Sequence, residues 1–447
     1  MLAPALAAAL MIGIACAWSP RYWAVAVALA GTGAVVSDAG PADAVAGVRP
    51  ACVAYPGTVE QAAGVLRAAA SLGMTVVPRG GGRRISWGPP PARCDVIADM
   101  TRMNRIIEHA AGDLVVRAET GVLLGQLSEV LAEKGQRLAL DAPPAATVGG
   151  VVATGTAGPL RLRYGTPRDL LIGITVVRPD GRVAHSGGKV VKNVAGYDIG
   201  KLFASSLGTL GLITEATFRL HPLASLSAYV TRHYDDATAA AEAVVAAATS
   251  PLQAAAAEIE RDGPGAPVQV GIMLEGTPDG VSERAERMAA LLGHGAQTAL
   301  TPPGWWAARG ETAPGAVGGT LIRVAFWAAE LRRVLDAIEL VANGTQLRPA
   351  VGGSAGAGVL YVSLDAGEDA DQVAMFIRAL RAATGHGGVQ DPGALARGSV
   401  VVRTAPAAVR ASVDMWGPVP GLDLMRAVKR QFDPANTMAP GRFAGGI

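Results

Sequence analysis

GGKVVKNVAGYDIGKLFASSLGTLGLITEATFRLHP, residues 187–222, combines a glycine-rich turn, a short helix and a strand in one run. Gly208 and Gly211 flank two residues, so the backbone there can approach a flat ligand closely, because glycine has no side chain. Residues 212–220 are rich in strand-forming types and predict a strand that carries the chain into a sheet. The stretch suggests a flavin site, although one such run alone is weak evidence.

Two further glycine-rich loops lie upstream. The first, PRGGGR (residues 78–83), follows an apolar strand predicted at residues 74–77. Its glycines and arginines can offer N–H donors and positive charge to a pyrophosphate. The second, PAATVGGVVATGTAG (residues 144–158), consists almost wholly of small residues. Either loop alone is typical of a tight turn, but the order and spacing of all three favour a cofactor site.

In order, the segments RGGGRR, DAPPAATVGGVVATG, LRLRYGTPRDLLIGITVVRPDG and KNVAGYDIGKLFASSLGTLGLI closely resemble the FAD-binding domain of the vanillyl-alcohol-oxidase (PCMH) type, over roughly residues 50–222. Within that superfamily, GGKVVKNVAGYD and the ending KRQFDPANTMAPGRF (residues 429–443) are most similar to the smaller flavoprotein subunit (GlcE-type) of bacterial glycolate oxidase. The resemblance implies FAD, lying extended between two subdomains.

The resemblance also assigns cofactor-binding residues. They are Arg79, Gly80, Gly81, Gly82 and Arg83 for the pyrophosphate, Thr147, Val148, Gly149, Gly150 and Thr154 for the ribityl chain and the isoalloxazine ring, Gly211 and Ile213 for backbone contacts, and Arg168 and Asp169 for a buried pair that supports the loop. That pair would equally fit a structural salt bridge without a ligand contact. Relatives with covalent flavin carry a His at or after the pyrophosphate loop, where this chain has RRIS (residues 83–86), so we expect noncovalent FAD.

Composition limits the other classes of function. The chain has 447 residues, 39 basic and 37 acidic, for a formal net charge of +2. The near-zero net charge gives no strong positive potential that could attract nucleic acid, so we expect no such partner. The three cysteines form no CxxC pair and the six histidines are scattered, so we expect no metal site. A GxGxxG fingerprint after a first strand is missing, which leaves a nicotinamide cofactor without an evident site.

The expected organisation is α+β with three parts: an apolar extension at residues 1–40, a two-subdomain FAD-binding domain at residues 46–223, and a cap domain at residues 224–447. In the cap, strand-like runs alternate with Ala-rich helical runs, which suggests an antiparallel sheet with helices on one face. The extension is open to three interpretations: a membrane anchor, an export segment, or translation from upstream of the true start. We favour the last, and expect residues 1–40 to be dispensable for folding and FAD binding.

The cap departs from the larger catalytic relatives of this family. Their GHxGDGNxH-like motif holds a metal that polarises the substrate hydroxyl, but the corresponding residues 352–361 are GGSAGAGVLY, without either His. Trp305, Trp306 and Arg309 resemble an element near the substrate carboxylate in the same relatives; Arg309 could bind an acid, or could be a surface residue of a loop. Ala439 replaces an Asn that lies close to the flavin ring in the family.

The resemblance therefore implies an FAD-binding oxidoreductase, the flavoprotein subunit of a glycolate or other 2-hydroxy-acid oxidase complex. Its partners would be a larger flavoprotein subunit and an iron–sulfur subunit, and its expected location is cytoplasmic, with association to a membrane as the alternative. Two alternatives remain: an autonomous FAD-dependent oxidase or dehydrogenase of another alcohol or acid, and a flavin-bearing assembly scaffold without catalysis of its own.

Overall fold

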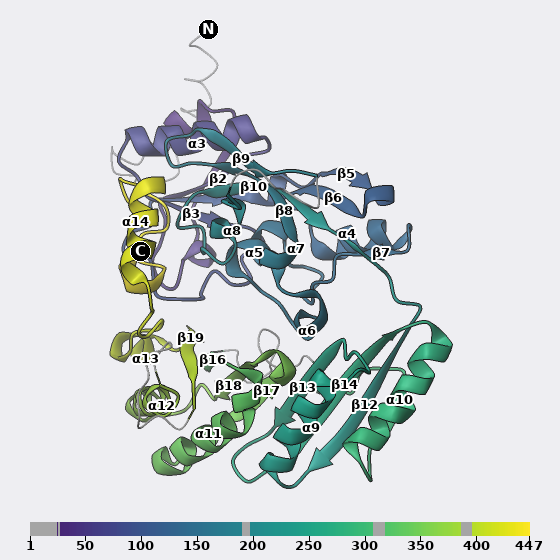
Figure 1. Cartoon of the computed structure of the whole chain (residues 1–447). Helices are drawn as coiled ribbons and strands as arrows, with labels where there is room; N and C mark the ends of the chain where they lie inside the picture. The colour runs from purple at the N-terminus through teal and green to yellow at the C-terminus, as the bar shows by residue number, and fades with distance from the viewer. Residues whose placement is uncertain (1–24, 26, 190–196, 307–317, 386–395) are drawn as a thin grey trace.

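The computed structural model describes residues 25, 27–189, 197–306, 318–385 and 396–447. It confirms an α+β fold with two halves (Figure 1). We call residues 25–222 the first half and residues 226–412 the second half. The first half contains a four-stranded and a five-stranded sheet, and the second half is built on one eight-stranded sheet.

The first half consists of two packed units. The four-stranded sheet has the order β1-β2-β4-β3, in which β1 pairs antiparallel and the rest are parallel, and helix α3 packs on its core. Its elements are β1 (Val35–Asp38), β2 (Cys52–Tyr55), α3 (Val59–Ser71), β3 (Val76–Arg79) and β4 (Val96–Asp99).

The second unit is an antiparallel sheet of order β5-β6-β10-β8-β9, whose core includes residues of α4 and α5. Its strands and helices are β5 (Ile106–Ala110), β6 (Val115–Glu119), α4 (Leu124–Ala132), α5 (Val148–Thr154), α6 (Arg161–Tyr164), α7 (Pro167–Leu170), β8 (Leu171–Val177), β9 (Val183–Gly187), α8 (Gly200–Phe203) and β10 (Leu212–Arg219), with the small ladder of β7 (Gln136–Arg137) and β11 (His221–Pro222) beside them.

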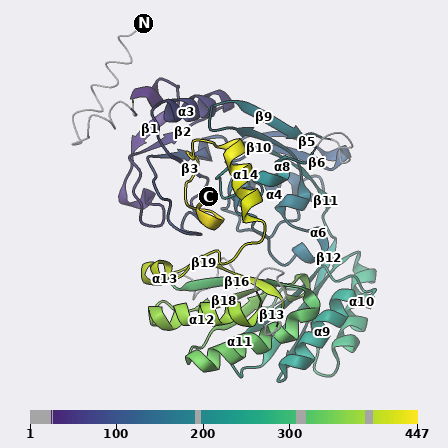
Figure 2. The same cartoon turned by 60° about the vertical axis from the view of Figure 1, so that its left-hand side comes forward.

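The second half is an antiparallel sheet of order β15-β12-β14-β13-β17-β18-β16-β19. Its strands are β12 (Leu226–Tyr234), β13 (Ala256–Arg261), β14 (Val268–Gly276), β15 (Gln297–Ala299), β16 (Thr320–Phe326), β17 (Ala350–Gly353), β18 (Val359–Leu364) and β19 (Gly398–Thr404). Its helices are α9 (Ala237–Thr249), α10 (Pro278–Leu292), α11 (Leu331–Thr345), α12 (Ala370–Ala383) and α13 (Ala407–Ser412). As the sequence predicted, the helices cover one face, and the other face looks toward the first half (Figures 1 and 2).

Local sequence explains α3 well. The Thr58 hydroxyl accepts a hydrogen bond from the N–H of Gln61 at 3.2 Å, which satisfies a free donor of the first turn. Gly73 follows the helix with φ +61°, the left-handed conformation that glycine adopts without strain. Local chemistry thus accounts for both ends of the helix.

The amino-terminal region corrects one expectation. Strand β1 lies within residues 1–40 and pairs with β2 along its whole length. Val25 and Leu29 are buried in the same core as α3. The described part of this region therefore packs into the first half, contrary to the expectation of a dispensable extension, and we expect its removal to uncover that core and the edge of β2. No helix among the described residues has both the length and the apolar character needed to cross a bilayer.

The carboxyl-terminal segment returns to the first half, although the sequence analysis assigned all of residues 224–447 to the cap. Helix α14 (Leu422–Phe432) and the chain end lie beside the first half in both views (Figures 1 and 2). Val76 N donates to Thr437 O at 2.8 Å and Ala439 N donates to Val76 O at 2.9 Å, so the tail adds a short bridge beside β3. The Lys429 ammonium, buried beneath it, donates to Asp433 at 2.7 Å.

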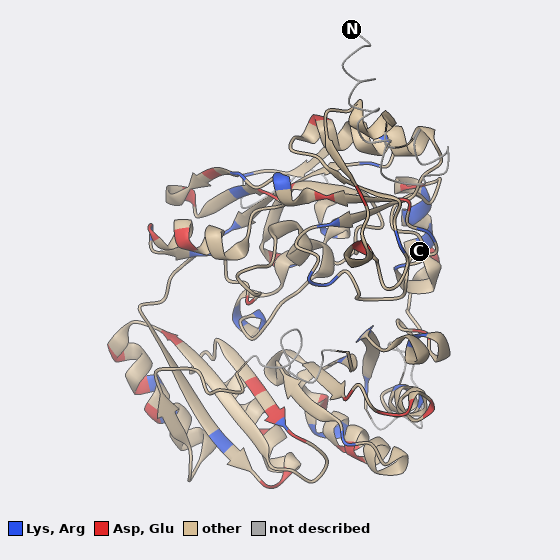
Figure 3. Cartoon of the chain, turned by 180° about the vertical axis from the view of Figure 1, so that it is seen from behind, with Lys and Arg blue, Asp and Glu red and all other residues tan. Residues whose placement is uncertain are grey.

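An ion pair between β7 and β14 joins the two halves. Arg137 of β7 donates to both carboxylate oxygens of Glu275 on β14, at 2.7 and 2.6 Å, and the Tyr164 hydroxyl donates to the same carboxylate at 3.0 Å. Burial raises the pKa of Glu275, but the charge and hydrogen bonds of Arg137 outweigh burial and hold it below its ordinary value. Elsewhere, basic and acidic residues are spread over both halves (Figure 3).

Candidate cofactor site

A cavity lies between the two units of the first half, with an empty volume of about 880 Å³ that includes its open mouth. All three glycine-rich segments of the sequence analysis line it. The assigned residues that do so are Arg79, Gly80, Gly81, Gly82, Arg83, Thr147, Gly149, Gly150, Thr154, Gly211 and Ile213. Segments far apart in the chain thus converge on one cavity.

Glycine is required in this lining because the loops touch one another. A Cβ on Gly80 would overlap the Thr147 hydroxyl, and one on Gly149 would lie 2.5 Å from the Cβ of Thr120. Gly81 differs, because its nearest neighbours would be Ala145 O at 3.3 Å and the Thr147 methyl at 3.7 Å. Gly80 and Gly149 are therefore needed for packing within the protein, whereas a Cβ on Gly81 would be tight against one carbonyl oxygen and would need only a small shift of it.

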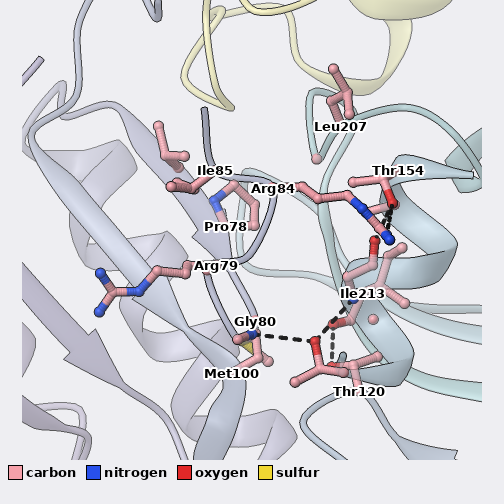
Figure 4. Close-up of a pocket in the computed structure, with 18 of the residues that line it drawn as sticks. Pro78, Arg79, Gly80, Arg84, Ile85, Met100, Thr120, Thr154, Leu207 and Ile213 are labelled. Carbon is pink, nitrogen blue, oxygen red and sulfur yellow. Dashed lines mark hydrogen bonds between the residues drawn. The ribbon is translucent and has the colours of Figure 1, made fainter. Parts of the chain in front are cut away.

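Thr147 connects two of the loops. It is the N-cap of α5, and its hydroxyl accepts from Gly150 N at 3.2 Å and from Gly81 N at 3.4 Å (Figure 4). Residues 148–154, expected to be part of a loop, are in fact this short helix, because Thr147 caps it and Val148, Val151 and Val152 bury one side in the core. The cap holds the first glycine loop against the second.

The arginines do not all act as expected. Arg79 lines the cavity with its backbone, but its guanidinium pairs with Asp43 at 2.6 Å and Asp99 at 2.7 Å and points away from Arg84 in Figure 4. Its charge is thereby neutralised within the protein. Arg83 is exposed at the edge of the cavity. The positive charge expected from the RGGGRR loop comes instead from its last residue, Arg84.

Arg84 and Arg442 supply the buried charge of the lining, and neither was among the assigned residues. Arg84 reaches Thr156 and lies over the Trp87 ring, 4.9 Å from its centroid. Burial lowers the pKa of Arg84 to about 9 and that of Arg442 to about 10, so both stay cationic at neutral pH. Arg442 donates to the carbonyls of Ile85 and Trp87, which ties the tail to the loop.

The cavity fits an extended dinucleotide. Its lining is mostly backbone and small side chains, which lets a pyrophosphate approach N–H groups, and the two guanidinium groups can balance its negative charge. Among the described lining residues, none is a His, Cys or Tyr that could bond a flavin covalently. Noncovalent attachment remains a prediction that a chemical test must decide.

Three assigned residues lie elsewhere, and a fourth is outside the described part of the chain. Val148 is in the core of the first half rather than at the cavity. Arg168 and Asp169 are both exposed, so the expectation of a buried pair is wrong: Asp169 instead accepts from Thr166 N at 2.8 Å and caps the single turn of α7. Arg309 lies outside the described residues.

The opposite wall of the interface comes from the second half. Residues 352–361, which lack the histidines of the metal motif, form the end of β17, a turn and the start of β18. No group of three His, Cys, Asp or Glu side chains suited to a metal occurs in the described parts of the chain. Residues of this sheet face the cavity region instead with arginines and a tyrosine, which the sequence analysis did not single out.

Comparisons with known proteins agree with this geometry. Residues 50–187 match the family model described as "FAD binding domain". The chain is 33% identical over 210 residues to the mitochondrial D-lactate dehydrogenase [cytochrome] of Arabidopsis thaliana, covering 47% of this chain and 37% of that protein. It is 31% identical over 201 residues to glycolate oxidase subunit GlcD of Bacillus subtilis, covering 44% and 42%. The chain thus spans less than half the length of these relatives.

Solved structures extend the likeness to the whole fold. p-Cresol methylhydroxylase with substrate bound matches with a TM-score of 0.67 at 18% identity, covering 88% of this chain and 89% of that one. A chitooligosaccharide oxidase matches with a TM-score of 0.64 at 16% identity, covering 93% and 97%. The fold is therefore the PCMH type, and the FAD expected from the sequence is confirmed as the cofactor of residues 50–187.

Proposed function

We propose, from an FAD-binding domain set in a PCMH-type fold, that this chain is an FAD-dependent oxidoreductase acting on a small 2-hydroxy acid, as a flavoprotein subunit of a glycolate-oxidase-like complex. The observation that carries the proposal is the glycine-lined cavity beside a sheet face that bears half-buried arginines. The names of the relatives, D-lactate dehydrogenase, glycolate oxidase subunit and D-2-hydroxyglutarate dehydrogenase, support the substrate class.

In this proposal each half has its own task. The first half holds FAD, which supplies the electron-accepting chemistry when bound. The loop around Gly81, with Arg84 and Arg442, would hold the negatively charged part of the cofactor. The second half would cover the site, bind the acid and exclude water. A larger flavoprotein subunit and an iron–sulfur subunit would then complete the complex and pass electrons onward.

The first experiment is flavin reduction under anaerobic conditions. Purified protein should show a flavin absorbance band, and acid precipitation should release FAD to the supernatant if attachment is noncovalent. We expect negligible turnover of glycolate or D-lactate by the isolated chain, and turnover after co-expression with the two partner subunits. A complex that leaves its flavin oxidised with every 2-hydroxy acid tested would reject the proposal.

Autonomous activity is the second candidate, favoured by the half-buried phenol of Tyr361 and the arginines of the second half, which could hold an acid without a metal. Steady-state turnover by the isolated chain with an artificial acceptor would select this alternative. An FAD-loaded complex that assembles normally but transfers no electrons would instead favour a scaffold.

A further inference from the structure

Three arginines, two from the sheet of the second half and one from α6 of the first half, gather between the halves. Arg323 of β16 lies directly opposite Tyr361 of β18 in the antiparallel register. Side chains alternate along a strand, and the neighbours of these two residues, Ile322, Val324 and Leu360, are in the core beneath the helices. Arg323 and Tyr361 therefore project together toward the first half.

Arg403 and Arg161 complete the group from two other elements. Arg403 lies in β19 where the register with β16 shifts, and its guanidinium stands over the Trp87 ring of the first half, 5.1 Å from the centroid. Arg161 begins α6, the short helix that hangs from the first half and contacts β13 (Figure 1). The group thus spans the interface between the halves.

The electrostatic effects show that these groups are close. Burial raises the pKa of Tyr361, but the charges of Arg161, Arg323 and Arg403 outweigh burial and lower it below its ordinary value. Burial lowers the pKa of Arg403 to about 10, and the charge of Arg323 adds to the decrease. Arg84 of the cofactor cavity acts on the same phenol and on Arg403, so the group adjoins that cavity.

These cations have no carboxylate partner. Among the described residues, no Asp or Glu lies within ion-pair distance of Arg161, Arg323 or Arg403. Glu258 is nearby, but burial raises its pKa to about 8, so it is mainly neutral at pH 7. Cations that are half-buried without a carboxylate partner are costly unless an anion joins them.

Unsatisfied polar atoms point to the same conclusion. In the described parts of the chain, the buried Nε of Arg403, Oε1 of Glu258 and the hydroxyl of Ser363 have no hydrogen-bond partner. All three residues lie on strands of the eight-stranded sheet, outside its helix-covered core. Buried polar groups are nearly always paired, so these open donors and acceptors on the sheet are available to a polar ligand.

We propose that Arg161, Arg323 and Arg403, gathered around Tyr361, bind the carboxylate group of a small organic acid beside the cofactor cavity. This rests on the proposed function in taking that acid to be the substrate. Guanidinium groups bind carboxylates through two parallel hydrogen bonds, and partial burial strengthens such bonds. The hydroxyl end of the acid would then lie near Tyr361 and the cavity.

The experiment measures equilibrium binding to the FAD-loaded protein by calorimetry and by the shift of the flavin absorbance. The probes are glycolate and D-lactate, with one carboxylate, malate and 2-hydroxyglutarate, with two, and glycolamide, the uncharged amide of glycolate. We expect acids to bind, glycolamide not to bind, and Arg323→Gln to weaken binding at least tenfold. Arg332→Gln, on the exposed side of α11, is the matched control and should change nothing. The two pairs of acids show whether one or two carboxylates are recognised.

Equal affinity for acids in wild type and Arg323→Gln, or equal affinity for glycolate and glycolamide, would overturn the proposal. If Arg323→Gln loses FAD or unfolds, Arg403→Lys, which keeps the charge but not the paired hydrogen bonds, should weaken binding several-fold. The two proposals fail differently. Binding that depends on Arg323 without electron transfer would reject only the function, whereas turnover with an unchanged KM in Arg323→Gln would reject only this site.

Discussion

The cofactor cavity and the arginine group face the same interface but are built from different kinds of groups. The cavity is lined by backbone and small residues from three glycine-rich segments, and close approach of loops excludes a Cβ at Gly80 and Gly149. The arginine group consists of long side chains from α6, β16, β18 and β19, which only the folded sheet brings together. A backbone-lined site is therefore visible in local sequence, whereas a site of side chains depends on topology.

The first test asks how much the Arg137–Glu275 ion pair, which joins the two halves, contributes to the stability of the fold. Arg137→Met leaves the Glu275 carboxylate, whose side chain is 2% exposed, buried without its partner. We expect the free energy of unfolding to fall by about 3–5 kcal/mol, as for other broken buried pairs. Urea denaturation followed by fluorescence would measure it.

Arg333→Met, which removes an exposed pair with Glu330 on the surface, should cost less than about 1 kcal/mol. The double variant Arg137→Met/Glu275→Met should recover much of the loss, because no charge is then left unpaired. If Arg137→Met alone lowers the free energy of unfolding by less than about 1 kcal/mol, the Arg137–Glu275 ion pair does not couple the halves.

A second test concerns how far the first half extends. Leu29 is fully buried against the core of α3, while Val27, on the same turn, is 38% exposed. Leu29→Ala should lower the free energy of unfolding by about 2–4 kcal/mol through lost burial and a cavity. Val27→Ala should change it by less than about 0.5 kcal/mol. If both substitutions change stability equally in thermal melts, residues 25–40 are an extension that does not contribute to the core.

The third test isolates the backbone-lined site. Gly81→Val adds a branched side chain at the cavity, where a Cβ meets only Ala145 O at 3.3 Å and the Thr147 methyl at 3.7 Å, so we expect the fold to remain after a small shift while the approach of the cofactor is blocked. We expect FAD affinity to fall roughly 100-fold, which corresponds to about 2.7 kcal/mol. Gly112→Val, at a surface glycine with open space and no positive φ, is the control. Full FAD occupancy in Gly81→Val would mean that this loop does not hold the cofactor.

The same contrast explains what the sequence could predict. The cap at Thr58 and the glycine after α3 are local signals readable from sequence, and the three glycine segments that the sequence analysis singled out do meet at the cavity. The ion pairs of Arg79 could not be foreseen, because Asp43 and Asp99 reach it from other segments of the chain. The resemblance that suggested a buried Arg168–Asp169 pair gave no account of the capping contact that Asp169 makes with Thr166. Arg442 was noted in the terminal motif, but only the return of the tail brings it to the cavity.

The last and smallest test concerns the protonation of the arginine group's neighbour. Burial raises the pKa of Glu258 to about 8 from an ordinary 4.5, against the opposing effects of Ser354 and Arg161. The folded state therefore holds a proton that the unfolded chain releases, and the stability contributed by this group is present at low pH and lost as pH rises toward 8. Glu258→Gln is neutral throughout. The excess of its free energy of unfolding over that of wild type should grow by about 2 kcal/mol between about pH 5.5 and pH 7.

Glu283→Gln, exposed on α10, should follow wild type at every pH. Urea denaturation across this range would measure the difference, and a constant offset would show that Glu258 is ionised in the folded protein, which would supply the arginines with the counter-charge that we assign to a bound acid.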